Sequence, residues 1–183
     1  MMILKKLHRI IGDNNMDIQE RLFRILVLIG LFGLLVGITA GIISGESIVN
    51  NVAMIIALLF FATVTYISIR FHKIQTGAVI MGSIIIYVVM PFNFVTTGGI
   101  YGGAPIWCLF GMFYVCLVIG GKIKYVLITS GFIVYAVLYY IAYRYPSLIV
   151  QHTVEMAYTD SLATLAIVTV IICGMILYQN AIY

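Results

Sequence analysis

Charged residues are scarce in this chain and are missing from its longest apolar runs. Of its 183 residues only 9% are charged, whereas 63% are hydrophobic, and the mean hydropathy is +1.16. No soluble domain of this size has such a composition, and repeated apolar runs of about 18 or more residues indicate transmembrane helices. The formal charge of +4 therefore gives no reason to expect a nucleic-acid partner. Its meaning lies in where the charges are placed along the chain.

Cysteine pairs and buried charges are missing as well. The three cysteines lie in apolar runs without a CxxC pair, which predicts neither a disulfide framework nor a metal site. A polar stretch from Gly12 to Arg24 precedes the first apolar run, unlike a cleavable signal peptide. The apolar runs contain no Asp, Glu, Lys, Arg or His, residues that mark proton relays, ion pathways and intramembrane hydrolases. We therefore expect no pump, no membrane protease, no catalytic residue and no cofactor.

Six apolar runs predict an all-α fold, a polytopic six-helix transmembrane bundle. Nine of the ten Lys and Arg residues lie before the first run, between the second and third, or between the fourth and fifth. Arg144 alone lies on the other side, so the positive-inside rule places both termini in the cytoplasm. The inner loops are short, which makes the runs they join antiparallel neighbours. The runs are Ile25–Ser44, Val52–Ile69, Thr76–Met90, Ile106–Ile119, Tyr125–Ala142 and Leu162–Tyr178.

The chain's start and its first run suggest contacts with lipid and with another helix. Residues 1–15 form an N-terminal juxtamembrane segment, where an amphipathic helix is expected on the inner leaflet. In the first run a glycine recurs at every fourth position, along one ridge that another helix can approach closely. The ridge serves either packing within the bundle or homodimerisation. It consists of Gly33, Gly37, Gly41 and Gly45.

The outer segment Pro91–Pro105 is the first candidate for a ligand site, because irregular backbone at membrane depth is tolerated where it lines a protein cavity. The runs beside it reach only about 21–23 Å, short of the roughly 30 Å hydrocarbon core. Either the helices continue past Pro91 and before Pro105, or the segment dips into the membrane. Pro91 is expected to kink or end the third helix. The alternative is that the glycines only form turns.

The residues predicted to bind a small or lipid-like ligand come from this segment and from the next outer one. Asp160, before the sixth run, is expected either to cap that helix or to contact a ligand or Arg144. His152 and Glu155 would share a helical face and could pair. The predicted site is Phe92, Asn93, Phe94, Thr96, Thr97, Gly98, Gly99, Tyr101, Gly102, Gly103, Trp107, Tyr143, Arg144 and Asp160.

One resemblance adds to this interpretation. The order of glycines, proline and tryptophan in 98–107, the Gly121–Lys122 turn and the Tyr145–Pro146 pair, followed by Asp160, resembles the N-terminal membrane sensor region of bacterial histidine kinases and diguanylate cyclases. The resemblance covers roughly Met90–Tyr178. It implies a bacterial cytoplasmic membrane and a last helix that continues into a signalling module.

The sequence departs from that pattern by ending at Tyr183, without a phosphoacceptor segment, a nucleotide-binding box or a GGDEF motif. We therefore expect an isolated sensory input domain, homodimeric in its full-length setting and signalling through the sixth helix, rather than an enzyme by itself. The alternatives are a small transporter or channel subunit, and a scaffold whose glycine ridge binds another protein's helix.

Overall fold

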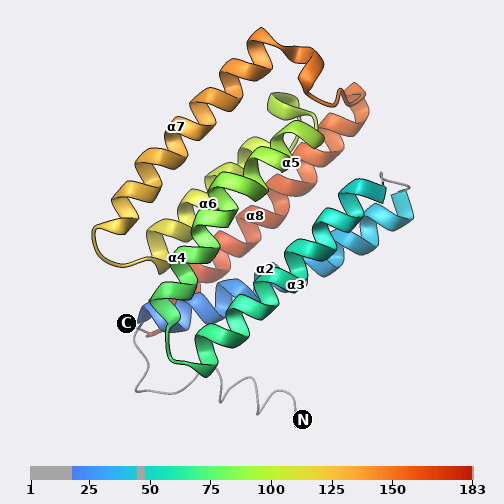
Figure 1. Cartoon of the computed structure of the whole chain (residues 1–183). Helices are drawn as coiled ribbons and strands as arrows, with labels where there is room; N and C mark the ends of the chain where they lie inside the picture. Colours follow the sequence, from blue (N-terminus) through green and yellow to red (C-terminus); the bar gives the residue numbers. More distant parts are fainter. Residues whose placement is uncertain (1–17, 45–47, 183) are drawn as a thin grey trace. The chain divides into compact units, whose positions relative to one another are not determined.

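The computed structural model describes residues 18–44 and 48–182, and this part of the chain contains helices and connecting segments but no β-strand. The expected all-α fold is thus confirmed for the described residues. The predicted segment 1–15 and Gly45 lie outside them. The elements are α2 (Ile18–Ser44), α3 (Ile48–Arg70), α4 (Ile74–Ile84), η1 (Ile85–Val89), α5 (Met90–Thr96), η2 (Gly99–Tyr101), α6 (Ala104–Val118), α7 (Ile123–Arg144), η3 (Pro146–Leu148) and α8 (Val154–Ile182) (Figure 1).

Four helical stretches are long and apolar enough to cross a membrane. They are Asn51–Arg70, Ile74–Thr96, Ile123–Arg144 and Val154–Leu177. In α6 the apolar helix is only 15 residues long, which corresponds to roughly 22 Å. The prediction of transmembrane helices is therefore supported, and the chain has the composition of a membrane protein.

Pro91 does not end the third helix, because α4, η1 and α5 run on as one helix to Thr96 (Figure 1). A proline ring clashes with the carbonyl four residues earlier in an α-helix. Here the turn just before the proline is a π-helix, in which the Met90 N–H reaches Ile85 O, five residues back. The wider turn gives the ring room. Of the two possibilities left open by the sequence, the helix continues past Pro91.

The chain divides into two compact units, of which the first comprises the described residues up to Met81 together with Cys116–Ile123. Its α3–α4 turn is a Schellman motif: the Lys73 N–H donates to Ser68 O (2.9 Å) and the His72 N–H to Ile69 O (3.4 Å). His72 has φ +52° at the position that glycine usually occupies.

The helices joined by this turn pack closely, as the short inner loop predicts. A Cβ added to Gly77 would overlap the hydroxyl of Ser68, which is buried and donates to Val64 O (2.6 Å). Gln75, near the start of α4, donates to Gln19 Oε1 of α2 (2.6 Å) and accepts the Gly120 N–H (3.1 Å). A polar side chain thus ties three parts of the unit together at one end.

The glycine ridge of α2 is open where its surroundings are described. A Cβ added to Gly33 would meet no described atom within 4 Å, and the same holds for Gly30. Gly33 is therefore not seen to pack against another helix of the bundle. At Gly37, Gly41 and Gly45, packing within the bundle and homodimerisation both stay predictions.

The second unit comprises Gly82–Val115 and Lys124–Tyr183, described here to residue 182. Gly131 of α7 packs against α6 and η1: a Cβ there would lie 2.9 Å from Met112 Sδ and 3.3 Å from Ile86 Cδ1. The Tyr135 hydroxyl of α7 donates to Cys108 O of α6 (2.9 Å). The expected antiparallel pairing of these two helices is confirmed, because Met112 and Cys108 face Gly131 and Tyr135 in reverse order.

The segment between α7 and the last helix is shorter than the sequence suggests. The last helix starts at Val154 rather than near Leu162, and Thr153 caps it: Thr153 Oγ1 accepts the Met156 N–H (3.3 Å) and Thr153 O the Ala157 N–H (2.9 Å). Asp160 therefore lies inside α8 and is not its cap. His152 precedes the helix, so the predicted shared helical face with Glu155 is wrong.

Replacing Gly131 with Val tests the close packing in the second unit. The added side chain overlaps Met112 and Ile86, and we expect the free energy of unfolding to fall by about 1–3 kcal/mol. Reversible unfolding in mixed detergent micelles measures it. Gly174→Val on α8 is the matched control, because a Cβ there meets nothing within 4 Å. Equal effects of the two substitutions would contradict this packing.

Candidate functional site

The first residues of the predicted segment Pro91–Pro105 belong to the continuous third helix, which ends at Thr96, and α6 starts at Ala104. The part between the helices is Thr97–Gly103, called the glycine loop below. Its first turn closes the helix: the hydroxyls of Thr96 and Thr97 donate to Phe92 O (2.9 Å) and Asn93 O (2.8 Å). Gly98 then takes φ +82° and Gly99 φ +60°, a backbone conformation that favours glycine. The threonine hydroxyls thus finish α5, and the glycines turn the chain.

The end of the glycine loop forms the start of α6. The Gly103 carbonyl accepts the N–H groups of Ile106 (3.0 Å) and Trp107 (3.2 Å), so Gly103 is the N-cap residue. Pro105 lies in the first turn, where a missing N–H costs no helical bond. The Gly103 N–H points out of the helix end and needs an acceptor from another part of the chain.

Asp160 of α8 supplies that acceptor. Its Oδ2 accepts the Gly103 N–H at 2.6 Å, while Oδ1 lies 3.4 Å from the Thr164 hydroxyl. In a capping box an acidic side chain of the same helix accepts the N-cap N–H; here a different helix, α8, provides it. A hydrogen bond to a carboxylate is stronger than one between neutral groups. Asp160 therefore holds the start of α6 on α8.

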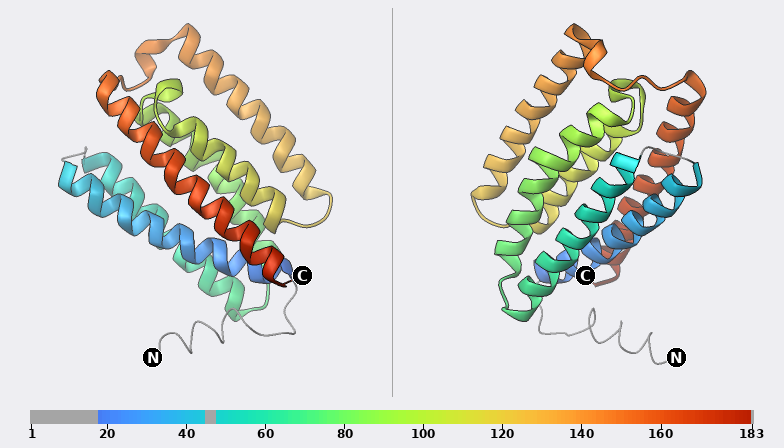
Figure 2. Two further views of the ribbon diagram at one scale, coloured as in Figure 1. Left: turned by 180° about the vertical axis from the view of Figure 1, so that it is seen from behind. Right: turned by 45° about the vertical axis from the view of Figure 1, so that its right-hand side comes forward.

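Two glycines make this approach possible. A Cβ added to Gly103 would overlap the Thr164 hydroxyl, and one added to Gly102 would overlap Thr97 O and lie 3.0 Å from Asp160 Oδ2. Ser161 of α8 also contacts the loop, because its hydroxyl donates to Tyr101 O (3.2 Å). Figure 2 shows the loop between α5 and α6 beside the first turns of α8.

The other side of the glycine loop packs against the segment before α8. The Val150 N–H donates to Val95 O (2.9 Å), and the buried Ile149 would lie 2.9 Å from a Cβ on Gly99. The His152 ring covers Gly98, whose Cβ position is 3.3 Å from His152 Nδ1. The loop is thus held along its length, and all four of its glycines are buried.

The predicted aromatic residues divide into buried and exposed ones. Phe94 is fully buried with Ala104, Leu138 and Ile149, and its ring centroid lies 5.6 Å from that of Tyr139. Tyr101 is 71% exposed, and Phe92 is exposed as well. Phe94 is therefore a core residue here, whereas Tyr101 is free to meet lipid or a ligand.

The remaining predicted residues lie at the ends of α6 and α7. Trp107 is half-buried with its ring against Phe110 (5.9 Å between centroids). Tyr143 is 83% exposed, and the Arg144 guanidinium lies 5.9 Å from the centre of the Tyr145 ring. Among the described contacts Arg144 is therefore placed over Tyr145 and not paired with Asp160. The structure brings the glycines and Asp160 together, and leaves Tyr143 and Arg144 on the surface.

A comparison of the chain with protein-family models, curated proteins and solved structures finds no match. The functional interpretation consequently depends on the residues themselves and on the resemblance of the sequence pattern given above. Ligand binding by the glycine loop stays a prediction. The structure adds three residues to the site that the sequence did not indicate: Thr164, Ser161 and Ile149. Only Thr164 could have been found from the sequence, because it follows Asp160 by four positions and so lies on the same face of the helix.

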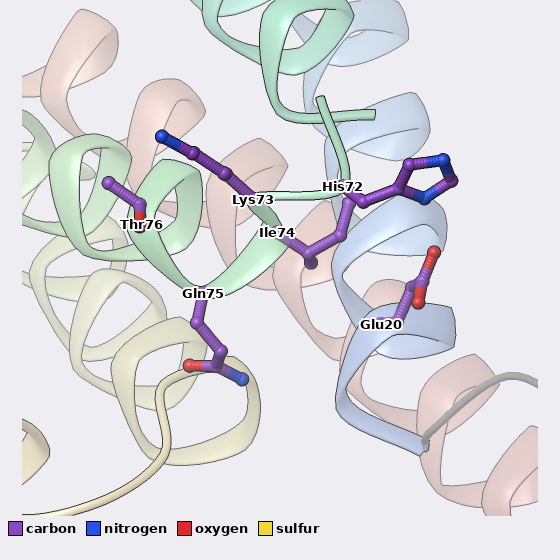
Figure 3. Close-up of a pocket in the computed structure, with 6 residues that line it drawn as sticks. All are labelled: Glu20, His72, Lys73, Ile74, Gln75 and Thr76. Atoms are coloured by element: carbon purple, nitrogen blue, oxygen red, sulfur yellow. The ribbon is translucent and has the colours of Figure 1, made fainter. Parts of the chain in front are cut away.

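A cavity of about 340 Å³ lies in the first unit and is lined by Glu20 and by His72, Lys73, Ile74, Gln75 and Thr76. In Figure 3 the side chains of Glu20 and His72 lie toward each other, whereas Lys73 and Gln75 extend away from them. Glu20 is already paired with Arg24 (2.6 Å). The lining is thus a mixed set of charges that selects no single ligand class. Within the described residues no group of three or more His, Cys, Asp or Glu could hold a metal ion.

Asp160→Ala tests the link between α6 and α8. It leaves the Gly103 N–H without an acceptor, and we expect it to lower the free energy of unfolding by about 1.5–3 kcal/mol. Unfolding in mixed micelles measures the change. Glu155→Ala is the control, because Glu155 is an exposed carboxylate on the first turn of the same helix. A loss no larger than that of Glu155→Ala would show that the bond contributes little.

Proposed function

We propose that the chain is the membrane-embedded sensory input domain of a bacterial signalling protein. In this proposal six segments span the cytoplasmic membrane with both termini inside, and α6 is the short fourth span. A small or lipid-like ligand acts on the glycine loop, and α8 carries the change to a cytoplasmic module. The pattern of glycines, proline and tryptophan shared with sensor regions of histidine kinases and diguanylate cyclases supports this class.

The observation that carries the proposal is the attachment of the glycine loop to the last helix. Asp160, Ser161 and Thr164 all belong to the outer part of α8, and each contacts the loop or the start of α6. A ligand that prefers one arrangement of the loop therefore also prefers one position of α8. Since α8 extends from Val154 to Ile182, a shift at its outer end is passed along a single continuous helix.

The placement of charges favours sensing over transport. The described helices with membrane-spanning length carry their Asp, Glu, Lys and Arg residues near their ends, as Arg70, Arg144 and Glu155 illustrate, and Asp160 lies before the apolar run that begins at Leu162. Transport pathways for ions and protons usually require such groups in the middle of the membrane. No specific feature of the structure favours the transporter or channel subunit that the sequence left as an alternative.

Homodimerisation is part of the proposal for the full-length protein. Gly33 lies on an exposed side of α2 with open space at its Cβ position. A second helix could therefore approach there at backbone distance. Lipid covers the other apolar side chains in this arrangement.

Cysteine labelling tests the orientation. In a chain whose three cysteines are replaced by serine, we expect a membrane-impermeant maleimide to label Tyr101→Cys on intact cells, because Tyr101 is exposed on the outer loop. Lys122→Cys, in the α6–α7 turn, should react only after the membrane is permeabilised. Labelling of both positions, or of Lys122→Cys alone, on intact cells would contradict the proposed topology.

A chimera tests signalling. The chain is fused through α8 to the cytoplasmic cyclase module of a bacterial diguanylate cyclase, and product formation is measured in membranes. We expect Asp160→Ala to change basal output at least about fivefold, because it releases the loop from α8. Glu155→Gln should leave output unchanged. Unaltered output from a correctly inserted Asp160→Ala chimera would contradict the proposal.

A further inference from the structure

We infer that residues 145–153, called the α7–α8 segment below, lie in the membrane interface and contact the lipid of that leaflet, which is the outer one in the proposed topology. The segment is not a continuous helix: α7 ends at Arg144, and the 3-10 turn Pro146–Leu148 follows. It contacts the glycine loop and leads into α8. Whatever surrounds this segment therefore acts on both.

The side chains of the α7–α8 segment are those of an interfacial element. Residues 145–154 contain no Asp, Glu, Lys or Arg. Leu148, Val150 and Val154 are exposed in the described structure, Val154 to 88%, whereas Ile149 is buried. Apolar side chains exposed on a connecting segment mark a surface that binds protein or lipid. In a chain with the composition of a membrane protein, lipid is the partner that is always present beside them.

Tyrosines surround the segment at this end of the second unit. Tyr143 and Tyr145 at the end of α7, Tyr158 of α8 and Tyr101 of the glycine loop are all exposed. Figures 1 and 2 show the end of α7, the glycine loop and the start of α8 at the same end of this unit. Tyrosine rings prefer the headgroup level of a membrane. The Arg144 guanidinium, 5.9 Å from the centre of the Tyr145 ring, adds a cation that suits headgroup phosphates.

The backbone of the segment is bonded within the protein, as contact with lipid requires. A peptide group without a partner is costly to move from water toward lipid. Backbone bonds run from the N–H of Leu148 to Tyr145 O (3.0 Å), of Ile149 to Pro146 O (3.1 Å) and of Val150 to Val95 O (2.9 Å). The Gln151 side chain folds back and donates to Pro146 O (3.0 Å) and Ile149 O (3.2 Å). Its amide thus serves the backbone of the segment rather than water.

The bond to Val95 indicates the depth of the segment. Val95 is the last residue but one of Ile74–Thr96, a stretch of 23 residues that is long and apolar enough to span a membrane. At 1.5 Å per residue such a helix reaches about 34 Å, slightly more than the roughly 30 Å hydrocarbon core. The end of this helix, and with it Val150, therefore lies where acyl chains meet headgroups.

Contact with lipid gives the proposed sensing a stimulus. Ile149 is buried against the glycine loop, 2.9 Å from the position of a Cβ on Gly99. A change in the lipid around the exposed neighbours Leu148 and Val150 shifts the loop as far as the lipid prefers one position of the segment. That such a shift is read as a signal rests on the proposed function; the position of the segment in the interface does not.

Spin-label accessibility on the full chain in lipid nanodiscs tests the inference. With the three cysteines replaced by serine, a nitroxide is attached to Leu148→Cys or Val154→Cys. Its collisions with oxygen, which dissolves in lipid, and with a water-soluble nickel chelate are then measured. We expect the oxygen-to-nickel collision ratio at both positions to exceed that of Lys122→Cys, in the exposed α6–α7 turn, at least about threefold. Ile133→Cys, exposed in the middle of α7, is the lipid reference.

Ratios at Leu148→Cys and Val154→Cys equal to that of Lys122→Cys would place the segment in water and overturn the inference. Few collisions with either reagent at both positions would show that a second copy or another protein covers the segment, and would overturn it too. If Leu148→Cys inserts poorly, Val150→Cys replaces it. A lipid-like ratio beside an unaltered chimera output would contradict the proposed function alone, whereas a water-like ratio beside an Asp160-dependent output would contradict only the lipid contact.

Discussion

The hydrogen bond from the Gly103 N–H to the Asp160 carboxylate determines how the glycine loop is attached to the last helix. A buried backbone N–H needs a hydrogen-bond acceptor, and the N-cap N–H of a helix finds none in the backbone of its own helix. The short α6 obtains one from α8. Asp160 reaches Gly103 from within α8, which starts at Val154, and the backbone of Gly102 and Gly103 lies close to this helix because neither residue has a side chain. The glycine pair and the attachment of the loop thus both serve the need of the Gly103 N–H for an acceptor.

The same requirement gives the glycine loop its relation to the last helix. A loop that only formed a turn would need positive φ angles at Gly98 and Gly99, but it would not need Gly102 and Gly103 to be free of side chains. Those two glycines serve close approach to Asp160 and Thr164. The glycine loop therefore connects α6 to α8 through these contacts. The proposed sensing depends on the stability of the contacts.

The helical class and the neighbouring helix pairs followed from composition, apolar run length and short inner loops. Two features could not be read from the sequence. Pro91 indicated a kink or an end of the helix, but the helix continues past it through a π-helical turn at Ile85–Val89, which the sequence did not indicate. The place of Asp160 before an apolar run left it either as a cap of its own helix or as a contact of a ligand or of Arg144. Its partner lies 57 positions away, so only the tertiary structure could identify it.

The measurement that tests this account most directly is a double-mutant cycle between Gly103 and Thr164, read as free energies of unfolding in micelles. Gly103→Ala overlaps the Thr164 hydroxyl and comes within 2.9 Å of Thr164 Cβ, and Thr164→Ala removes the hydroxyl, which makes the closer of these two contacts. We predict that the double variant is more stable than the sum of the single effects by at least about 1 kcal/mol, as for residues in direct contact. Additive effects of the two substitutions would show that the glycine loop does not rest on α8, and would contradict the account.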